Sequence, residues 1–229
     1  MPAGQIPGTA ALSAAILGIS LTAKLTEQFF QFGIPNLNYQ LPGILNLELW
    51  RLVTYPFAIS SFLNLMLGIL VLWMFGGWFE TSYGTRDYLR FFFAATIGAG
   101  ILAIPFTFLV NMVMPFFDPG LAEGPDPAFD AMLVALALTS PNSNILFGFV
   151  LPMRAKTVIW IILGLHVVSG IYNGAAAMGV SLAGMAMGYL LVTGYWRPSR
   201  LRDLTKMWRL RRRRQGLYVV PPKKDHTLH

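Results

Sequence analysis

The amino-acid sequence predicts an all-α membrane protein, and three observations lead to this fold class. Of the 229 residues, 55% are hydrophobic and only 12% are charged, a composition too apolar for an ordinary soluble domain. The apolar residues lie in long blocks rather than in amphipathic stripes, so a thicker soluble core does not explain them. Several blocks approach the roughly 20 residues that a helix needs to cross a bilayer. We therefore expect a polytopic helical protein without a separate soluble domain.

The predicted segments differ in length. Five blocks meet or approach a full span: Thr9–Ala23, Ser61–Phe79, Tyr88–Val113, Thr157–Tyr172 and Ala175–Tyr195. A further block, Pro127–Thr139, is only about 20 Å long as a helix and cannot cross a hydrocarbon core of roughly 30 Å. We therefore expect six segments with a short fourth helix, which leaves a water-accessible depression lined by the acidic loop before it. The transmembrane domain is expected over residues 1–195 and a basic cytoplasmic tail over residues 196–229.

Basic residues predict the orientation, since Lys and Arg collect on the cytoplasmic side of a membrane. With six segments, all Lys and Arg except Lys24 and Arg51 lie on the side of the two termini. A five-segment arrangement would scatter these charges. The opposite side carries the acidic residues Asp118, Glu123, Asp126 and Asp130. Both termini are therefore expected in the cytoplasm, and we place the protein in a bacterial inner membrane.

The tail and the cysteine count bear on partners. The side chains of Leu201, Leu204, Trp208 and Leu210 fall roughly on one helical face with basic residues around it, which favours a helix on anionic lipid. Contact of Arg211–Arg214 with nucleic acid is the weaker alternative, so no nucleic-acid partner is expected. The absence of cysteine excludes disulfides, thiolate zinc sites and thiol nucleophiles. No cofactor and no metal are predicted.

Two motifs place polar residues near the membrane boundary. Trp50-Arg51 precedes the second apolar block, where the indole suits the headgroup region and the guanidinium can reach phosphates or a carboxylate. We favour an interface anchor over a substrate contact for this pair. Glu80 ends the second block and needs a partner at that depth: Arg86, Arg90 or free backbone amides. A structural role is expected for Glu80.

A third motif concerns helix packing. Gly184 and Gly188 form a GxxxG pattern in the last apolar block, which lets a neighbouring helix approach closely. We expect that neighbour to be the helix formed by Pro127–Thr139.

Together, the Trp-Arg pair, the glutamate flanked by glycines and the GxxxG segment resemble the rhomboid intramembrane serine proteases over roughly residues 41–195. The resemblance implies a rhomboid-like bundle of six transmembrane helices with a short fourth helix. It also implies that Glu80 caps the end of its helix.

The residues that such a protease needs for catalysis are replaced. The resemblance puts Asp126 at the position of the nucleophile and Ser181 at that of the histidine base. It puts Asn64 and Gly68 at the two oxyanion-supporting positions. A serine hydroxyl does not accept a proton near neutral pH as an imidazole does. We therefore predict a catalytically dead member, a pseudoprotease scaffold that binds transmembrane helices of client or partner proteins.

Other functions stay open. One alternative is an active serine-type peptidase with a displaced site, and another is a transporter or an accessory subunit of a larger membrane complex. Asp126 and Asp130 are spaced to share a helix face, but we favour Asp126 as an N-cap with Pro127 at the first helical position over cation or proton binding. His166 is expected to hydrogen-bond to a neighbouring helix rather than to catalyse.

Overall fold

The computed structural model describes residues 6–30, 33–114, 119–140, 144–147 and 151–194. Residues Met1–Val192 form one compact unit and Thr193–His229 a second. Only the first two residues of the second unit are described, so the predicted tail helix and its lipid contact lie outside the described residues.

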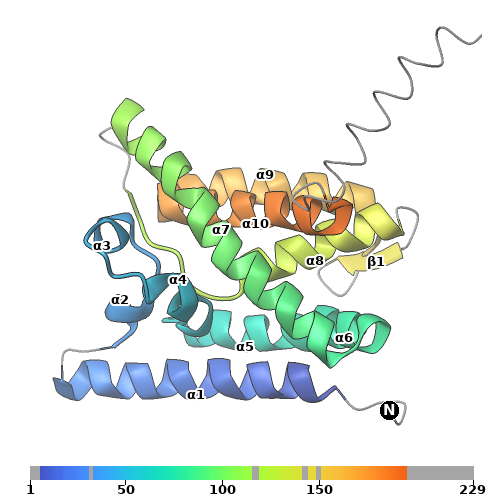
Figure 1. Cartoon of the computed structure of the whole chain (residues 1–229), viewed down its shortest axis with the longest axis horizontal. Helices are drawn as coiled ribbons and strands as arrows, with labels where there is room; N and C mark the ends of the chain where they lie inside the picture. The colour runs from blue at the N-terminus through green and yellow to red at the C-terminus, as the bar shows by residue number, and fades with distance from the viewer. Residues whose placement is uncertain (1–5, 31–32, 115–118, 141–143, 148–150, 195–229) are drawn as a thin grey trace, which may run out of the picture. The chain divides into compact units, whose positions relative to one another are not determined.

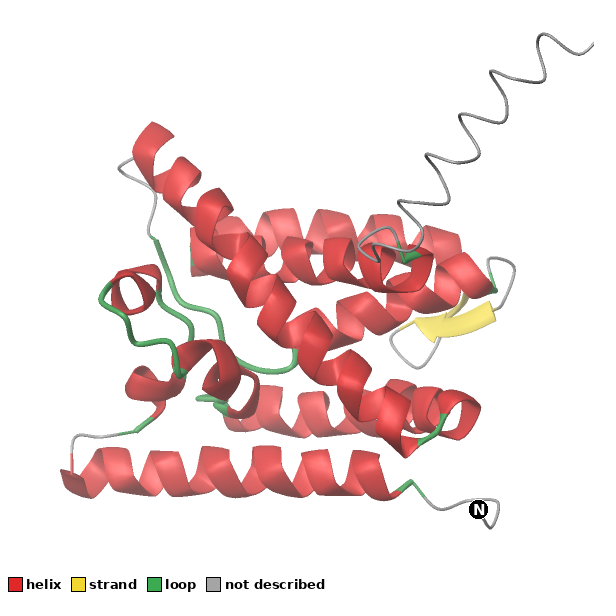
Figure 2. Cartoon of the chain, in the orientation of Figure 1, coloured by secondary structure: helices red, strands yellow, loops and turns green. Residues whose placement is uncertain are grey.

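The described chain is mostly helical, as Figure 2 shows. Four short elements join the first long helix to the second: α2, α3, α4 and the turn η1. The elements in order are α1 (Pro7–Phe30), α2 (Ile34–Leu37), α3 (Leu41–Leu45), α4 (Arg51–Thr54), η1 (Tyr55–Phe57), α5 (Phe62–Val71), η2 (Leu72–Gly76), α6 (Gly77–Tyr83), α7 (Thr85–Val113), α8 (Asp126–Thr139), β1 (Asn144–Phe147), β2 (Leu151–Arg154), α9 (Ala155–Asn173) and α10 (Ala175–Thr193).

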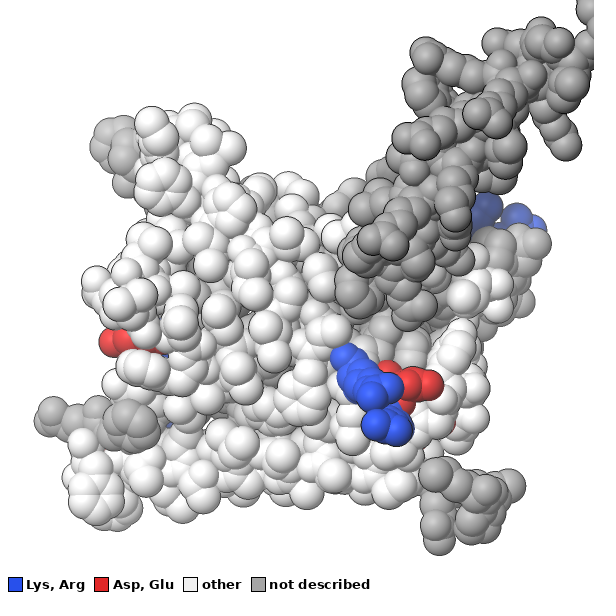
Figure 3. All heavy atoms as spheres, in the orientation of Figure 1, with Lys and Arg blue, Asp and Glu red and all other residues white. Residues whose placement is uncertain are grey.

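Five helices of the described chain are long and apolar enough to cross a membrane: α1, the continuous stretch Phe62–Tyr83, α7, α9 and α10. These five confirm the prediction of an all-α membrane protein. The sixth predicted segment, α8, has 14 residues and is not among the candidate spans. Figure 3 shows charged atoms only towards the two ends of the visible face, with a broad uncharged band between them.

The two ends of the bundle differ in their charge. The basic end holds Arg86 and Arg90 at the start of α7 and Arg154 and Lys156 at the start of α9. The loop end is formed by residues 33–61, 119–125 and 173–175. Its basic residue Arg51 pairs with Glu48, and Lys24 in the neighbouring part of α1 has its Nζ 3.1 Å from Glu27. At the basic end Arg90 is likewise 3.7 Å from Asp87, but Arg86, Arg154 and Lys156 add positive charge there for which no ion pair is found among the described residues.

Helix α8 is enclosed by the other helices. It contacts α7, α9 and η2, and Figure 1 shows it in the middle of the bundle. Ala128, Met132 and Ala135 pack into a cluster with residues of α1, α5 and α7. Leu133 and Ala137 pack against the first turn of α9. A helix of this length is stable here because it meets protein, not lipid, on most of its sides.

The close approach of α10 to α8 was predicted from the GxxxG motif and is confirmed. A Cβ atom added to Gly184 would lie 2.6 Å from the Pro127 main chain, and one added to Gly188 would lie 2.6 Å from that of Ala131. Both distances are too short for a real contact, so the two backbones meet because these residues have no side chain.

Glu80 links the basic ends of α1 and α6. Its carboxylate accepts hydrogen bonds from the amides of Gly8 and Thr9 at 2.8 and 2.7 Å. The hydroxyls of Thr9 and Thr85 donate to it at 2.8 and 2.6 Å. Backbone amides are therefore its partners, not the arginines, and it caps the first turn of α1 instead of its own helix.

Two local features were not predicted. The expected helix Ser61–Phe79 contains the π-helical turn η2, where an added Cβ on Gly76 would collide with the Tyr88 hydroxyl. An antiparallel hairpin, β1–β2, precedes α9 with Asn144 opposite Arg154. The apolar content of both segments fits a helix or a strand, so composition alone does not find them.

Candidate functional site

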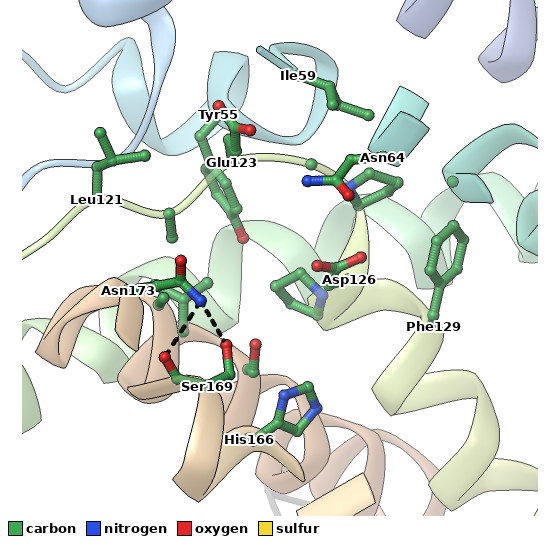
Figure 4. Close-up of a pocket in the computed structure, with 18 of the residues that line it drawn as sticks. Tyr55, Ile59, Asn64, Leu121, Glu123, Asp126, Phe129, His166, Ser169 and Asn173 are labelled. Atoms are coloured by element: carbon green, nitrogen blue, oxygen red, sulfur yellow. Dashed lines mark hydrogen bonds between the residues drawn. The ribbon is translucent and has the colours of Figure 1, made fainter. Parts of the chain in front are cut away.

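A cavity of about 740 Å³ opens at the loop end of the bundle, above the first turn of α8 (Figure 4). Its wall on one side is α5 and on the other α9 and α10, and the segment before α8 closes it. This is the depression predicted from the shortness of the fourth helix. The lining residues with polar side chains are Tyr55, Ser60, Asn64, Glu123, Asp126, His166, Ser169, Asn173 and Ser181.

The loop before α8 is fixed by backbone hydrogen bonds to the segment 33–61. Tyr39 and Ala122 exchange two bonds of 2.8 and 3.0 Å, and the Gly124 amide donates to the Tyr55 carbonyl at 2.9 Å. Gly124 has φ +85°, a conformation that favours glycine, so the turn into α8 depends on this residue. The Tyr55 hydroxyl donates to the Thr96 carbonyl at 2.7 Å. Burial raises the pKa of Tyr55 well above its usual value, which keeps the hydroxyl protonated as a donor.

Asp126 faces the cavity but does not cap α8. The predicted N-cap is wrong by one residue: α8 begins at Asp126 itself, and Pro125 is the residue before it. The helix starts early because the Pro125 carbonyl already accepts the Ala128 amide at 2.9 Å. No cap bond from a side chain is present at this helix start. Among the described residues, no donor is hydrogen-bonded to the Asp126 carboxylate, which is exposed to the cavity.

Glu123 is the second carboxylate in the wall. One of its oxygens, Oε1, accepts hydrogen bonds from the Ser60 hydroxyl at 2.6 Å and from the Ser60 amide at 3.2 Å. The other, Oε2, is buried and has no hydrogen-bond partner among the described residues. Only one of the two carboxylate oxygens of Glu123 is therefore hydrogen-bonded.

His166 joins the cavity to a third carboxylate. Its Nε2 lies 2.9 Å from Oδ2 of Asp130 on α8, within ion-pair distance, although the two atoms are not aligned as in a regular hydrogen bond. The Asp130 side chain is 7% exposed and that of His166 is 17% exposed. His166 was predicted to hydrogen-bond to a neighbouring helix; it does contact one, through Asp130 of α8, but at ion-pair distance and not in a regular hydrogen bond. Within the described chain, no serine hydroxyl donates to His166.

The four residues that the sequence singled out as altered catalytic positions meet in this cavity. Asn64 and Gly68 lie on α5, Asp126 on α8, and Ser181 on α10. Trp50 and Arg51 lie elsewhere. The Trp50 side chain is 54% exposed, whereas Arg51 is buried and donates to the carbonyls of Pro35 and Asn38 at 2.8 and 3.0 Å. Arg51 therefore holds the segment 33–61 together and does not reach for lipid phosphates.

Two cavity residues were missed by sequence reasoning. The Asn173 amide group donates to the Ser169 hydroxyl at 2.9 Å and to its carbonyl at 3.2 Å, as the dashed lines in Figure 4 show. Together with His166 they occupy positions i, i+3 and i+7 of α9. That spacing puts three polar side chains on one face of a membrane helix, and it is the signal that could have found them.

The cavity reaches into the membrane-spanning part of the bundle. His166 lies seven residues before the end of α9, a depth of about 10 Å at 1.5 Å per residue. The described residues hold no group of three or more His, Cys, Asp or Glu placed to bind a metal ion. The lining includes the carboxylates of Glu123 and Asp126, and none of the described lining residues is Lys or Arg. The site is thus a polar depression with acidic side chains between apolar helices.

Comparison with protein families matches residues 9–203 to a family described as Eukaryotic integral membrane protein (DUF1751). This match corrects two predictions. The assignment to the rhomboid proteases as a catalytically dead member is wrong, because the matching family covers the same segments on which the resemblance rested. The bacterial inner membrane is also wrong, because the family is eukaryotic.

The membrane location itself is supported by this match and by the five candidate spans. The reading of Asp126, Ser181, Asn64 and Gly68 as former catalytic positions stays a prediction that depended on the resemblance. The matched region covers most of the 229 residues. The chain therefore belongs to this family of eukaryotic integral membrane proteins.

Proposed function

We propose that this protein is a non-enzymatic membrane scaffold that binds a transmembrane helix of a partner protein in the cavity between α5 and α9. The observation that carries the proposal is a polar cavity of about 740 Å³ whose two walls belong to lipid-facing helices. Only 33% of the α5–α6 span and 17% of the α9 span are buried inside the protein. A helix in the bilayer can therefore approach both walls without leaving the membrane.

The lining residues suit a helix as occupant. Leu67 and Val71 offer apolar surface on α5, while Ser169 and Ser181 are small polar groups of the kind that bind helices to one another in membranes. The peptidase alternative has less support, because the Nε2 atom of His166 faces Asp130 and not a serine. The transporter alternative would need polar residues along a whole pathway, and the polar side chains of this cavity gather at the loop end.

Site-specific photocrosslinking tests the proposal. A photoreactive benzoylphenylalanine replaces Leu67, which lines the cavity and is 45% exposed, or Ile101 of α7 as a lipid-facing control that is 51% exposed. We expect discrete adducts with membrane proteins from position 67 and only lipid adducts from position 101.

A blocking variant makes the test specific. A Cβ on Gly68 would have only an ordinary contact of 3.6 Å with Ile59, so Gly68→Phe fills the cavity without a main-chain collision. Gly164→Phe is the matched control, since nothing lies within 4 Å of a Cβ there. Loss of the adducts in Gly68→Phe but not in Gly164→Phe supports the proposal, and equal adducts in both variants would contradict it.

A further inference from the structure

We infer that the group recognised by this cavity is a primary ammonium, the group at the end of a lysine side chain carried by the partner helix. The inference rests on the proposed function and adds the chemistry of the partner. It follows from the hydrogen-bonding capacity and the charge that the cavity leaves unused.

Three side-chain donors of the cavity wall are already bound to the protein itself. The Tyr55 hydroxyl donates to the Thr96 carbonyl, the Ser60 hydroxyl to Glu123, and the Asn173 amide to Ser169. The carboxylate acceptors, in contrast, are largely without hydrogen-bond donors. Neither oxygen of Asp126 has a hydrogen-bonded donor among the described residues, and Oε2 of Glu123 is buried without one. A ligand that completes these two carboxylates must therefore bring donors.

The charge points to a cation. Glu123 lies in the loop before α8 and Asp126 is the first residue of α8, and both line the cavity. His166 is already paired with Asp130. Among the described lining residues none is Lys or Arg, and the imidazole of His166 faces Asp130, so neither Glu123 nor Asp126 has an ion-pair partner there. The buried Oε2 of Glu123 is the more telling group, because an acceptor without a donor is costly to bury and a protonated amine would satisfy it.

The depth of the cavity fits a lysine near the end of a helix. The polar groups extend about 10 Å into the bundle from the loop end, or about two helical turns. A lysine placed within the last two turns of a partner helix has its ammonium at this depth. In lipid that ammonium would need to snorkel to the interface, whereas here it meets carboxylates.

The test uses the full-length protein in nanodiscs and fluorescent transmembrane peptides of a Leu-Ala sequence. One peptide carries Lys seven residues from its end, a second carries norleucine there, and a third carries Glu. We expect the Lys peptide to bind at least about tenfold more tightly than the norleucine peptide, and the Glu peptide more weakly than both. Asp126→Asn and Glu123→Gln should each remove the preference for Lys. Asp87→Asn, at an exposed carboxylate on the basic end, is the matched control and should retain it.

Each outcome separates the inference from the proposed function. Equal binding of all three peptides would overturn the inference and leave the helix-binding function standing. Failure of every peptide to bind would overturn both. Butylammonium distinguishes a free amine from a lysine side chain: if it binds in an Asp126-dependent way while the Lys peptide does not, the site takes a soluble amine and the partner-helix source is wrong.

Discussion

Two carboxylates of this protein, Glu80 and Asp126, show how differently one bundle treats the same chemical group. Glu80 is 3% exposed and accepts four hydrogen bonds, two from backbone amides of α1 and two from threonine hydroxyls. Asp126 faces an open cavity, and no donor among the described residues is bound to it. Glu80, whose carboxylate is fully hydrogen-bonded, holds helices together at the basic end. Asp126, whose carboxylate has no bound donor among the described residues, is available to a ligand at the loop end.

The comparison predicts opposite costs of removal, and the larger belongs to Glu80. Glu80→Ala leaves two buried amides and two hydroxyls without an acceptor, so we expect a loss of about 3 kcal/mol or more in the free energy of unfolding. For a chain of this size that is a fall of roughly 6–12 °C in melting temperature. The measurement is thermal unfolding in detergent. Asp87→Ala is the control. The Asp87 carboxylate is exposed and lies 3.7 Å from Arg90, so its removal should change the melting temperature little. A loss at Glu80 no larger than at Asp87 would show that the α1 cap is not structural.

A second prediction tests the contact that positions α8 and thereby Asp126. Gly184→Ala puts a methyl group 2.6 Å from the Pro127 main chain, which is expected to cost about 1–3 kcal/mol through overpacking. Gly164→Ala makes the same change in a span where nothing lies within 4 Å, and there alanine should stabilise the helix by up to about 1 kcal/mol. Thermal unfolding of the two variants side by side checks the sign of each effect. The close packing of α8 and α10 would be refuted by a gain in stability for both.

Chemical reactivity gives a third way to compare the two groups. A hydrophobic carbodiimide reaches carboxyl groups from the lipid or from a cavity, but Glu80 is enclosed and bonded on both oxygens. We expect Asp126 to be modified at least about tenfold faster than Glu80, a rate ratio equivalent to about 1.4 kcal/mol. Mass spectrometry of the digested protein measures the two adducts in one sample. Similar rates would mean that the cavity is closed to reagents of this size.

The sequence predicted the helices better than it predicted the cavity. Long apolar blocks are recognisable because a bilayer demands length, and the block Pro127–Thr139 was correctly identified as too short to span. The glycine pair at 184 and 188 predicted the right neighbour for the same reason: only a close helix needs two residues without side chains on one face. Each of these two signals is local in sequence and follows from a single physical constraint: bilayer thickness for the apolar blocks, and close helix packing for the glycine pair.

The parts that were wrong depend on residues far apart in the chain or on one-residue shifts. Glu80 binds residues 71 and 72 positions away, so its cap on α1 cannot be read from its own segment. The start of α8 moved by one residue because Pro125 supplies the first helical carbonyl. Arg51 was expected to reach lipid phosphates or a carboxylate, and the carboxylate is correct, since Arg51 pairs with Glu48. Its further hydrogen bonds to carbonyls of the segment 33–61 were not predicted. The family resemblance failed for a related reason, since short glycine and tryptophan motifs report membrane packing and not descent.

The smallest expected effect is at Asp126, and it is the change that separates structure from function. An N-cap aspartate replaced by alanine costs about 0.5–2 kcal/mol, and asparagine in its place costs almost nothing. Because α8 begins at Asp126 and has no side-chain cap bond, Asp126→Ala should instead stay within about 0.5 kcal/mol of the natural protein, as should Asp126→Asn. Thermal unfolding of both variants measures this. A loss above 1 kcal/mol in Asp126→Ala that asparagine restores would mean that the side chain caps α8 after all, and its availability to a ligand would be refuted. If the Asp126 carboxylate serves to bind a partner, Asp126→Ala and Asp126→Asn should be equally stable, and both should lose binding of the lysine peptide.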